Sequence, residues 1–215
     1  MTSFLYKNLR GVWLSIVAIS ATITAAEQQA DVYAATAVQR ALKISNSLAL
    51  TDPAHSARVG ALIARQYIDL NALQAARERD IKSINSNLDK APVGSALVDH
   101  NAAFEAKVAS LHRAYLARLA VELTPEQIDL VKDGHTYGVL PLTYRVYQKM
   151  LPQLTLGQKA KILGFLTEAR ELAMDAGSAK EKHAWFGKYK GKINNYLSAE
   201  GYNMKEAEKN LLTPR

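Results

Sequence analysis

Apolar and small residues recur along this 215-residue chain at alternating steps of three and four. Between residues 27 and 50 the series is Ala34, Ala37, Ala41, Ile44 and Leu48, which places one apolar stripe along a helix. A strand would need a period of two, and the sequence shows no such alternation. The chain also has only 11 glycines and 6 prolines, too few for a turn-rich sandwich or barrel. We therefore expect an all-α fold.

The same periodicity divides the chain into helices that begin at capping residues. Asp52 and Pro53 suit one helix start, and the pattern L-T-x-x-Q at residues 123–127 and 154–158 suits two more, because Thr and Gln can cap a first turn reciprocally. The predicted helices span residues 27–50, 53–88, 97–119, 124–133, 141–150, 155–177 and 178–198. We expect a helical bundle in which the second and third helices form a long antiparallel hairpin, followed by a C-terminal helical subdomain.

Residues 27–215 are expected to form a single all-helical domain. It would contain Ala-rich long helices over 27–122, a second helical half over 123–202 and a tail over 203–215. Because the chain has no cysteine, no disulfide can stabilise it. Packing alone must hold the domain together, which is feasible at this length.

The first 26 residues have the three-part plan of a secretory signal peptide. Lys7 and Arg10 form a basic start, residues 11–25 are apolar or small, and small residues permit cleavage before Glu27. An uncleaved N-terminal anchor is the alternative. We expect a periplasmic or secreted bacterial protein that has no membrane span once the signal is removed.

The positive charge is concentrated near the end of the chain. The sequence has 27 Lys and Arg against 20 Asp and Glu, and residues 178–215 hold eight of these basic residues but only four of the acidic ones. A localised basic surface favours an anionic partner. Outside the cytoplasm we expect an acidic polysaccharide or an anionic membrane surface rather than nucleic acid. A solvated lysine-rich face is the alternative interpretation.

Residues 183–197 would form a helix with two faces of opposite character. One face carries Trp185 and Tyr189, and the other carries Gly187 and Gly191. Two glycines inside a helix cost about 2 kcal/mol relative to alanine, so another helix backbone or a ligand should lie close to them. The predicted ligand-binding residues of the chain are Tyr137, Arg170, Trp185, Lys188, Lys190, Asn194 and Asn195.

Acidic residues on the preceding helix are candidates for acid–base chemistry. Glu171 and Asp175 could meet His183 across the short turn between the helices. A structural ion-pair network and paired catalytic carboxylates both explain them. A polar turn over residues 132–137 either lines a site or closes a helix. The candidate catalytic residues are His183, Tyr189, Glu171 and Asp175.

Metal and cofactor chemistry have little support in the sequence. The five histidines are scattered, and there is no cysteine to complete a zinc site. The sequence has no glycine-rich phosphate loop and no dinucleotide fingerprint. We therefore expect no metal site and no cofactor.

Three long stretches resemble a known bacterial family. They are VKDGHTYG at residues 131–138, EARELAMDAG at 168–177 and KHAWFGKYKGKINNYL at 182–197. They are similar to secreted proteins with the domain of unknown function 3826, although His135 stands where methionine is expected. The resemblance covers residues 123–202, and the helix start at residues 50–52 and the Ala-rich helices also fit. It implies export and an all-helical fold, in bacteria rich in polysaccharide-degrading systems. It supplies no catalytic residues.

Three functions are compatible with these features. The leading hypothesis is an exported binding or accessory protein whose basic–aromatic C-terminal surface recognises an anionic or carbohydrate ligand. The second is a polysaccharide lyase or hydrolase in which His183, Tyr189 and Lys190 act together with the two acids. The third is a periplasmic chaperone, because the two L-T-x-x-Q motifs are similar to those of Spy and CpxP type proteins.

Overall fold

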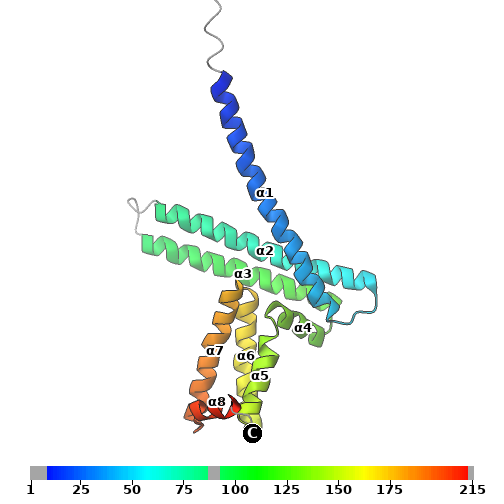
Figure 1. The fold of residues 1–215 in the computed structure, drawn as a ribbon, viewed down its shortest axis with the longest axis vertical. Coiled ribbons are helices and arrows are strands. Elements are labelled where there is room, and N and C mark those ends of the chain that lie inside the picture. Colours follow the sequence, from blue (N-terminus) through cyan, green and yellow to red (C-terminus); the bar gives the residue numbers. More distant parts are fainter. Residues whose placement is uncertain (1–8, 87–92, 213–215) are drawn as a thin grey trace, which may run out of the picture.

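The structure, a computed structural model, describes residues 9–86 and 93–212 and confirms the all-α prediction (Figure 1). The first helix begins at Leu9, inside the segment expected as a signal peptide, and continues to Asn46. Within the described residues no helix is both long enough and apolar enough to cross a membrane. The helices in these ranges are α1 Leu9–Asn46, α2 Pro53–Ser86, α3 Val93–Glu122, α4 Pro125–His135, α5 Val139–Met150, α6 Leu156–Met174, α7 Ala179–Ala199 and α8 Met204–Leu212.

Helices α2 and α3 form the expected antiparallel hairpin, and α1 lies across α2 (Figure 1). Together with α4 they bury one hydrophobic core, called here the N-terminal core, which includes Ala37, Ile63 and Leu119. The buried residues of α2 all lie between Val59 and Leu70. The first turns of α1 and the far end of the hairpin therefore extend away from the core, as Figure 1 shows.

Polar residues inside the hairpin pair with one another. The guanidinium group of Arg77 on α2 donates a hydrogen bond of 3.0 Å to the Asn101 side chain on α3. The same group lies 4.6 Å from the ring centroid of Phe104, a cation–π contact. These contacts pair a polar side chain of α2 with one of α3, although Nε of Arg77 itself is buried without a hydrogen-bond partner.

Helices α5 to α8 bury a second hydrophobic core, called here the C-terminal core. Its centre is the contact between α6 and α7, where Ile162, Leu166, Phe186 and Ile193 are almost completely buried. In Figure 1 helices α5, α6 and α7 stand side by side below the hairpin, with α8 across their lower end. The expected C-terminal helical subdomain is therefore present.

The end of the chain differs from the prediction. The sequence predicts a tail over residues 203–215, whereas the structure has helix α8 there. Met204 and Ala207 are buried in the C-terminal core, and Asn203 accepts a hydrogen bond of 3.1 Å from the backbone N–H of Glu206. A helix of nine residues is unstable by itself, so α8 depends on tertiary contacts that local periodicity does not reveal.

Both L-T-x-x-Q motifs are capping boxes, as predicted. The Thr124 hydroxyl accepts the backbone N–H of Gln127 at 3.3 Å, and the Gln127 side chain accepts the N–H of Thr124 at 3.1 Å. Thr155 and Gln158 repeat this arrangement at the start of α6. The motif therefore has a local structural explanation.

Gly134 marks a close approach between α1 and α4. A β-carbon at this position would lie 2.7 Å from Cγ1 of Ile44, which is itself buried in the N-terminal core. Gly187 of α7 is the opposite case: apart from its chain neighbours and the adjacent backbone of α7, no heavy atom of the described chain lies within 4 Å of a β-carbon built there.

Alanine substitution at these two glycines should have opposite effects on stability. We expect Gly134→Ala to lower the free energy of unfolding by about 1–3 kcal/mol through overpacking. Gly187→Ala should raise it by about 1 kcal/mol because alanine has the higher helix propensity. Urea denaturation of both variants measures the difference. A stabilised Gly134→Ala variant would contradict the packing of α1 against α4.

Candidate functional site

Helix α7 presents lysines and aromatic rings on one side. Trp185, Lys188 and Lys192 follow one another at steps of three and four, so their side chains share a face of the helix. The Lys188 ammonium group lies 5.0 Å from the ring centroid of Trp185. That of Lys192 lies 4.0 Å from the ring centroid of Tyr189. Both are cation–π contacts, which hold the ammonium groups near the rings.

Helix α6 extends the same surface. The Lys161 ammonium group lies 5.0 Å from the ring centroid of Phe165, and this ring meets Tyr196 of α7 edge-on at 6.4 Å. The rings of Phe165 and Tyr196 are half-buried, whereas the lysines are exposed. We call this surface the basic–aromatic face. It consists of Lys161, Phe165, Trp185, Lys188, Lys192 and Tyr196.

Of the other predicted binding residues of α7, Lys190 is exposed but points away from the basic–aromatic face. Asn195 is exposed three residues after Lys192, on the same side of the helix as the face. Asn194 is half-buried and accepts a hydrogen bond of 2.7 Å from the Tyr147 hydroxyl of α5. Tyr189, a catalytic candidate, is buried in the C-terminal core. The predicted binding residues of α7 therefore do not form one cluster.

Gly187 and Gly191 are open to space. In the part of the chain that the structure describes, no heavy atom beyond their own helix surroundings comes within 4 Å of a β-carbon built at either position. The expectation that another helix backbone packs against them is therefore wrong. The alternative, close approach of a ligand, stays a prediction.

His183 lies beside the polar turn that precedes α5. Its ring stacks with that of Tyr137, with 5.8 Å between the centroids and 17° between the planes. Tyr137 is 56% exposed and has a φ of 59°, a left-handed conformation that is costly for a bulky residue. The sequence named both residues as candidates but could not show that they meet.

The predicted acids of α6 face His112 of α3 rather than His183. The His112 ring approaches Asp175 at 2.7 Å and Glu171 at 3.5 Å. Hydrogen bonds to Asp175 and then Glu171 raise the pKa of His112 to about 9. Burial alone would raise the pKa of Glu171, but hydrogen bonds from His112 and Lys132 outweigh it and hold this pKa at about 2.

Arg170 belongs to the same network of ion pairs. Its side chain is buried and donates to Asp133 of α4 at 3.0 Å and to Asp129 of the same helix. Lys132, between these acids, contacts Glu171 at 2.9 Å. Because α3, α4 and α6 all contribute, the contacts favour the structural interpretation of the acids over paired catalytic carboxylates.

The sequence did not predict the burial of two titratable groups, His135 and Lys182. His135 is fully buried with Nε2 at 2.9 Å from the Tyr115 hydroxyl, and burial lowers its pKa to about 3, so it is neutral. Lys182 donates to two backbone carbonyls at the end of α6, at 3.1 and 2.9 Å. Burial lowers the pKa of Lys182 to about 8. The burial of Lys182 could have been predicted from its position four residues before Phe186, in the apolar stripe of α7.

A small polar cavity of about 140 Å³ lies between α1, α2 and the start of α7. Its lining includes side chains from distant parts of the sequence, and none of its lining residues is acidic. We call it the tyrosine pocket. It is defined by Tyr33, Arg40, Tyr67, Tyr137 and Lys182.

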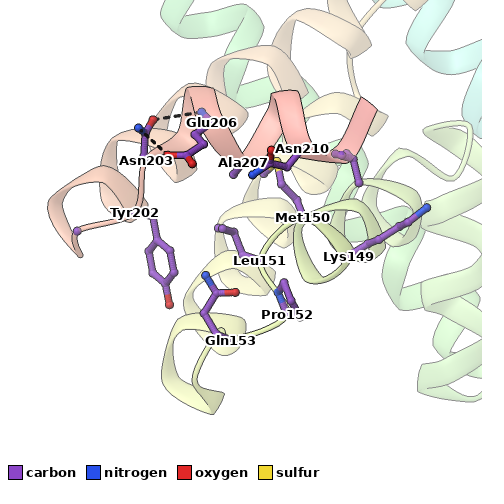
Figure 2. Close-up of a pocket in the computed structure, with 12 residues that line it drawn as sticks. Lys149, Met150, Leu151, Pro152, Gln153, Tyr202, Asn203, Glu206, Ala207 and Asn210 are labelled. Atoms are coloured by element: carbon purple, nitrogen blue, oxygen red, sulfur yellow. Dashed lines mark hydrogen bonds between the residues drawn. The ribbon is translucent and has the colours of Figure 1, made fainter. Parts of the chain in front are cut away.

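A larger open hollow of about 720 Å³ lies between the end of α5 and α8 (Figure 2). Three of its polar side chains serve local structure: Asn203 contacts Glu206, as the dashed lines of Figure 2 show, and the Tyr202 hydroxyl donates to Gln158. Lys149 points away from the other labelled side chains in Figure 2. We therefore place the candidate sites on the basic–aromatic face and in the tyrosine pocket.

The raised pKa of His112 predicts a specific pH dependence of stability. A folded-state pKa of about 9 against an ordinary 6.5 gives stability that is complete below pH 6.5 and is lost as the pH rises to 9. The Tm difference between wild type and His112→Gln should therefore be largest near pH 6 and shrink towards pH 9. Thermal denaturation at both pH values measures it.

Comparing the wild type with His112→Gln separates the effect of His112 from that of other titrating groups. Glu171 and Asp175 face it, and Lys132 contacts Glu171; these residues are present in both proteins. Lys182, with its pKa of about 8, also titrates in both. A Tm difference that stays constant from pH 6 to 9 would contradict the ion pairs of His112.

Comparison with known proteins shows the family. No match is found among curated proteins, and a similarity to Spy and CpxP type chaperones is not shown. A family described as protein of unknown function (DUF3826) matches residues 34–213. This range contains residues 123–202, which carry the long similar stretches, as well as the Ala-rich helices before them, and it includes the whole basic–aromatic face. The chain therefore belongs to the DUF3826 family.

Proposed function

We propose that this protein is exported and binds an acidic polysaccharide through the basic–aromatic face. The observation that carries the proposal is the combination of three lysines and three aromatic rings along one side of the α6–α7 pair. Partly exposed rings offer flat apolar surfaces on which sugar rings can stack. The adjacent ammonium groups can pair with carboxylates or sulfates of the same polymer.

The shape of the face favours an extended ligand over a small one. Trp185 and Tyr196 are eleven residues apart on α7, which corresponds to about 17 Å along the helix axis. No deep cavity is required, because a polymer can lie along the two helices. The excess of lysine over acid in residues 178–215 adds long-range attraction for an anionic chain.

The enzyme and chaperone hypotheses have less support. Glu171 and Asp175 contact His112, and Tyr189 is buried, so the proposed catalytic groups are not gathered around His183. The two L-T-x-x-Q motifs serve as helix caps. Neither arrangement offers a specific observation in favour of catalysis or of client binding.

The lysines of the face should control polysaccharide binding. We expect Lys188→Ala/Lys192→Ala to weaken binding to polygalacturonate at least about tenfold, since each ion pair lost costs binding free energy. Trp185→Ala should weaken it as well, through loss of stacking. Isothermal titration calorimetry measures the affinity, which should fall as salt is raised from 50 to 300 mM.

A matched control separates the face from overall charge. Lys180→Ala/Lys190→Ala removes the same charge from the opposite side of α7 and should leave the affinity nearly unchanged. Equal losses in the two double variants would refute a defined face. Absence of binding by the wild type to polygalacturonate, alginate and heparin would refute the proposed function.

Export predicts a processed N-terminus. If the signal peptide is removed as proposed, the protein purified from the periplasm or medium of the expressing bacterium should begin at Glu27. Intact-mass spectrometry measures this directly. Recovery of the full-length chain in the membrane fraction would instead support the uncleaved anchor.

A further inference from the structure

The tyrosine pocket is assembled from four separate parts of the chain. Tyr33 and Arg40 come from α1, Tyr67 from α2, Tyr137 from the turn before α5 and Lys182 from α7. Its volume of about 140 Å³ is the space of four or five water molecules. A group of a few heavy atoms fits such a cavity, whereas a polymer does not.

The pocket has an excess of positive charge. Arg40 and Lys182 line it together with no acidic residue. Within the described residues Arg40 has no ion pair; its guanidinium lies 5.7 Å from the Tyr67 ring centroid. Burial is the main cause that lowers the pKa of Lys182; the charges of Asp175 and Glu181 act in the opposite direction, and repulsion by Arg40 adds to the lowering. An anion between Arg40 and Lys182 would relieve the repulsion.

Hydrogen-bond donors remain for such an anion. An ammonium group has three N–H donors, and Lys182 uses two of them on backbone carbonyls. The lining residues Ser178 and Ala179 lie at the start of α7, where the helix dipole adds positive potential. Burial raises the pKa of Tyr67 to about 12, so its hydroxyl keeps its proton and can donate.

The backbone of Tyr137 is an independent sign of a site. Its φ of 59° places a large aromatic residue in a conformation that glycine adopts without cost. The core does not require this side chain, because it is 56% exposed. The strained turn nevertheless brings the ring to the edge of the pocket and against His183. Such strain is typical of positions that contact ligands.

We propose that the tyrosine pocket binds the oxyanionic group, a carboxylate or a phosphate, of a small ligand. Arg40 and Lys182 would contact the oxyanion, and the Tyr67 hydroxyl would donate a further hydrogen bond. The Tyr33 hydroxyl donates to the Tyr67 backbone carbonyl at 3.4 Å instead. The site is separate from the basic–aromatic face, and none of its five defining residues belongs to that face.

Binding of three small probes tests the proposal. Isothermal titration calorimetry of the full chain is carried out with sodium galacturonate, sodium phosphate and neutral galactose at equal ionic strength. We expect saturable binding of at least one anion and none of galactose. Binding of galacturonate alone identifies a carboxylate site, and binding of phosphate alone identifies a phosphate site. If neither anion binds more tightly than galactose, the proposal is wrong.

Two substitutions on exposed positions locate the bound anion. Arg40→Gln should weaken binding about tenfold through loss of a charge-assisted hydrogen bond. Lys43→Gln removes the same charge from an exposed position of α1 outside the pocket lining and should have no effect. Equal weakening by both would overturn the proposal by showing nonspecific attraction.

Tyr137→Gly should change stability and anion affinity in opposite directions. Removal of the left-handed strain should raise the Tm, while loss of the ring should weaken anion binding. A variant that gains stability and keeps full affinity would overturn the role of Tyr137. Lys188→Ala/Lys192→Ala should retain binding of the small anion, so this proposal and the polysaccharide proposal can fail independently.

Discussion

The ion pairs of α6 set the arrangement of the whole molecule. Arg170 and Glu171 connect α6 to α4, and Asp175 connects it to His112 of α3. Met174 of the same helix is buried in the N-terminal core, whereas Ile162 is buried in the C-terminal core. Because buried charges are tolerated only when they are paired, α6 has little freedom to rotate or slide. It therefore fixes the position of one core relative to the other.

The two candidate sites depend on this anchored helix. Helix α7 packs against α6 through its apolar stripe, which leaves its lysine-bearing side exposed beside Phe165 and forms the basic–aromatic face. The start of α7 comes to lie against α1 and α2 and closes the tyrosine pocket. A single helix thus contributes to an extended surface suited to a polymer and to a small cavity suited to one charged group.

Much of the fold could be predicted because it rests on local signals. Periodic apolar residues predicted the long helices. Thr124 and Thr155 predicted the starts of two helices, because capping depends on residues within one turn. Helix α8 could not be predicted, because nine residues need the C-terminal core to remain helical. The face of α7 was partly predicted: Trp185 and Lys188 belong to it, whereas Lys190 points elsewhere.

The sequence by itself determined the all-α class, the capping boxes and the concentration of positive charge near the end of the chain. Only the tertiary structure decided the partners of the helices. A helical wheel gives the direction of a side chain around its own axis but not the helix that it meets. For this reason Glu171 and Asp175 were placed near His183 but contact His112, 63 residues before Asp175. In the same way, the helical wheels of α1 and α2 could not show that Arg40 and Tyr67 line one pocket.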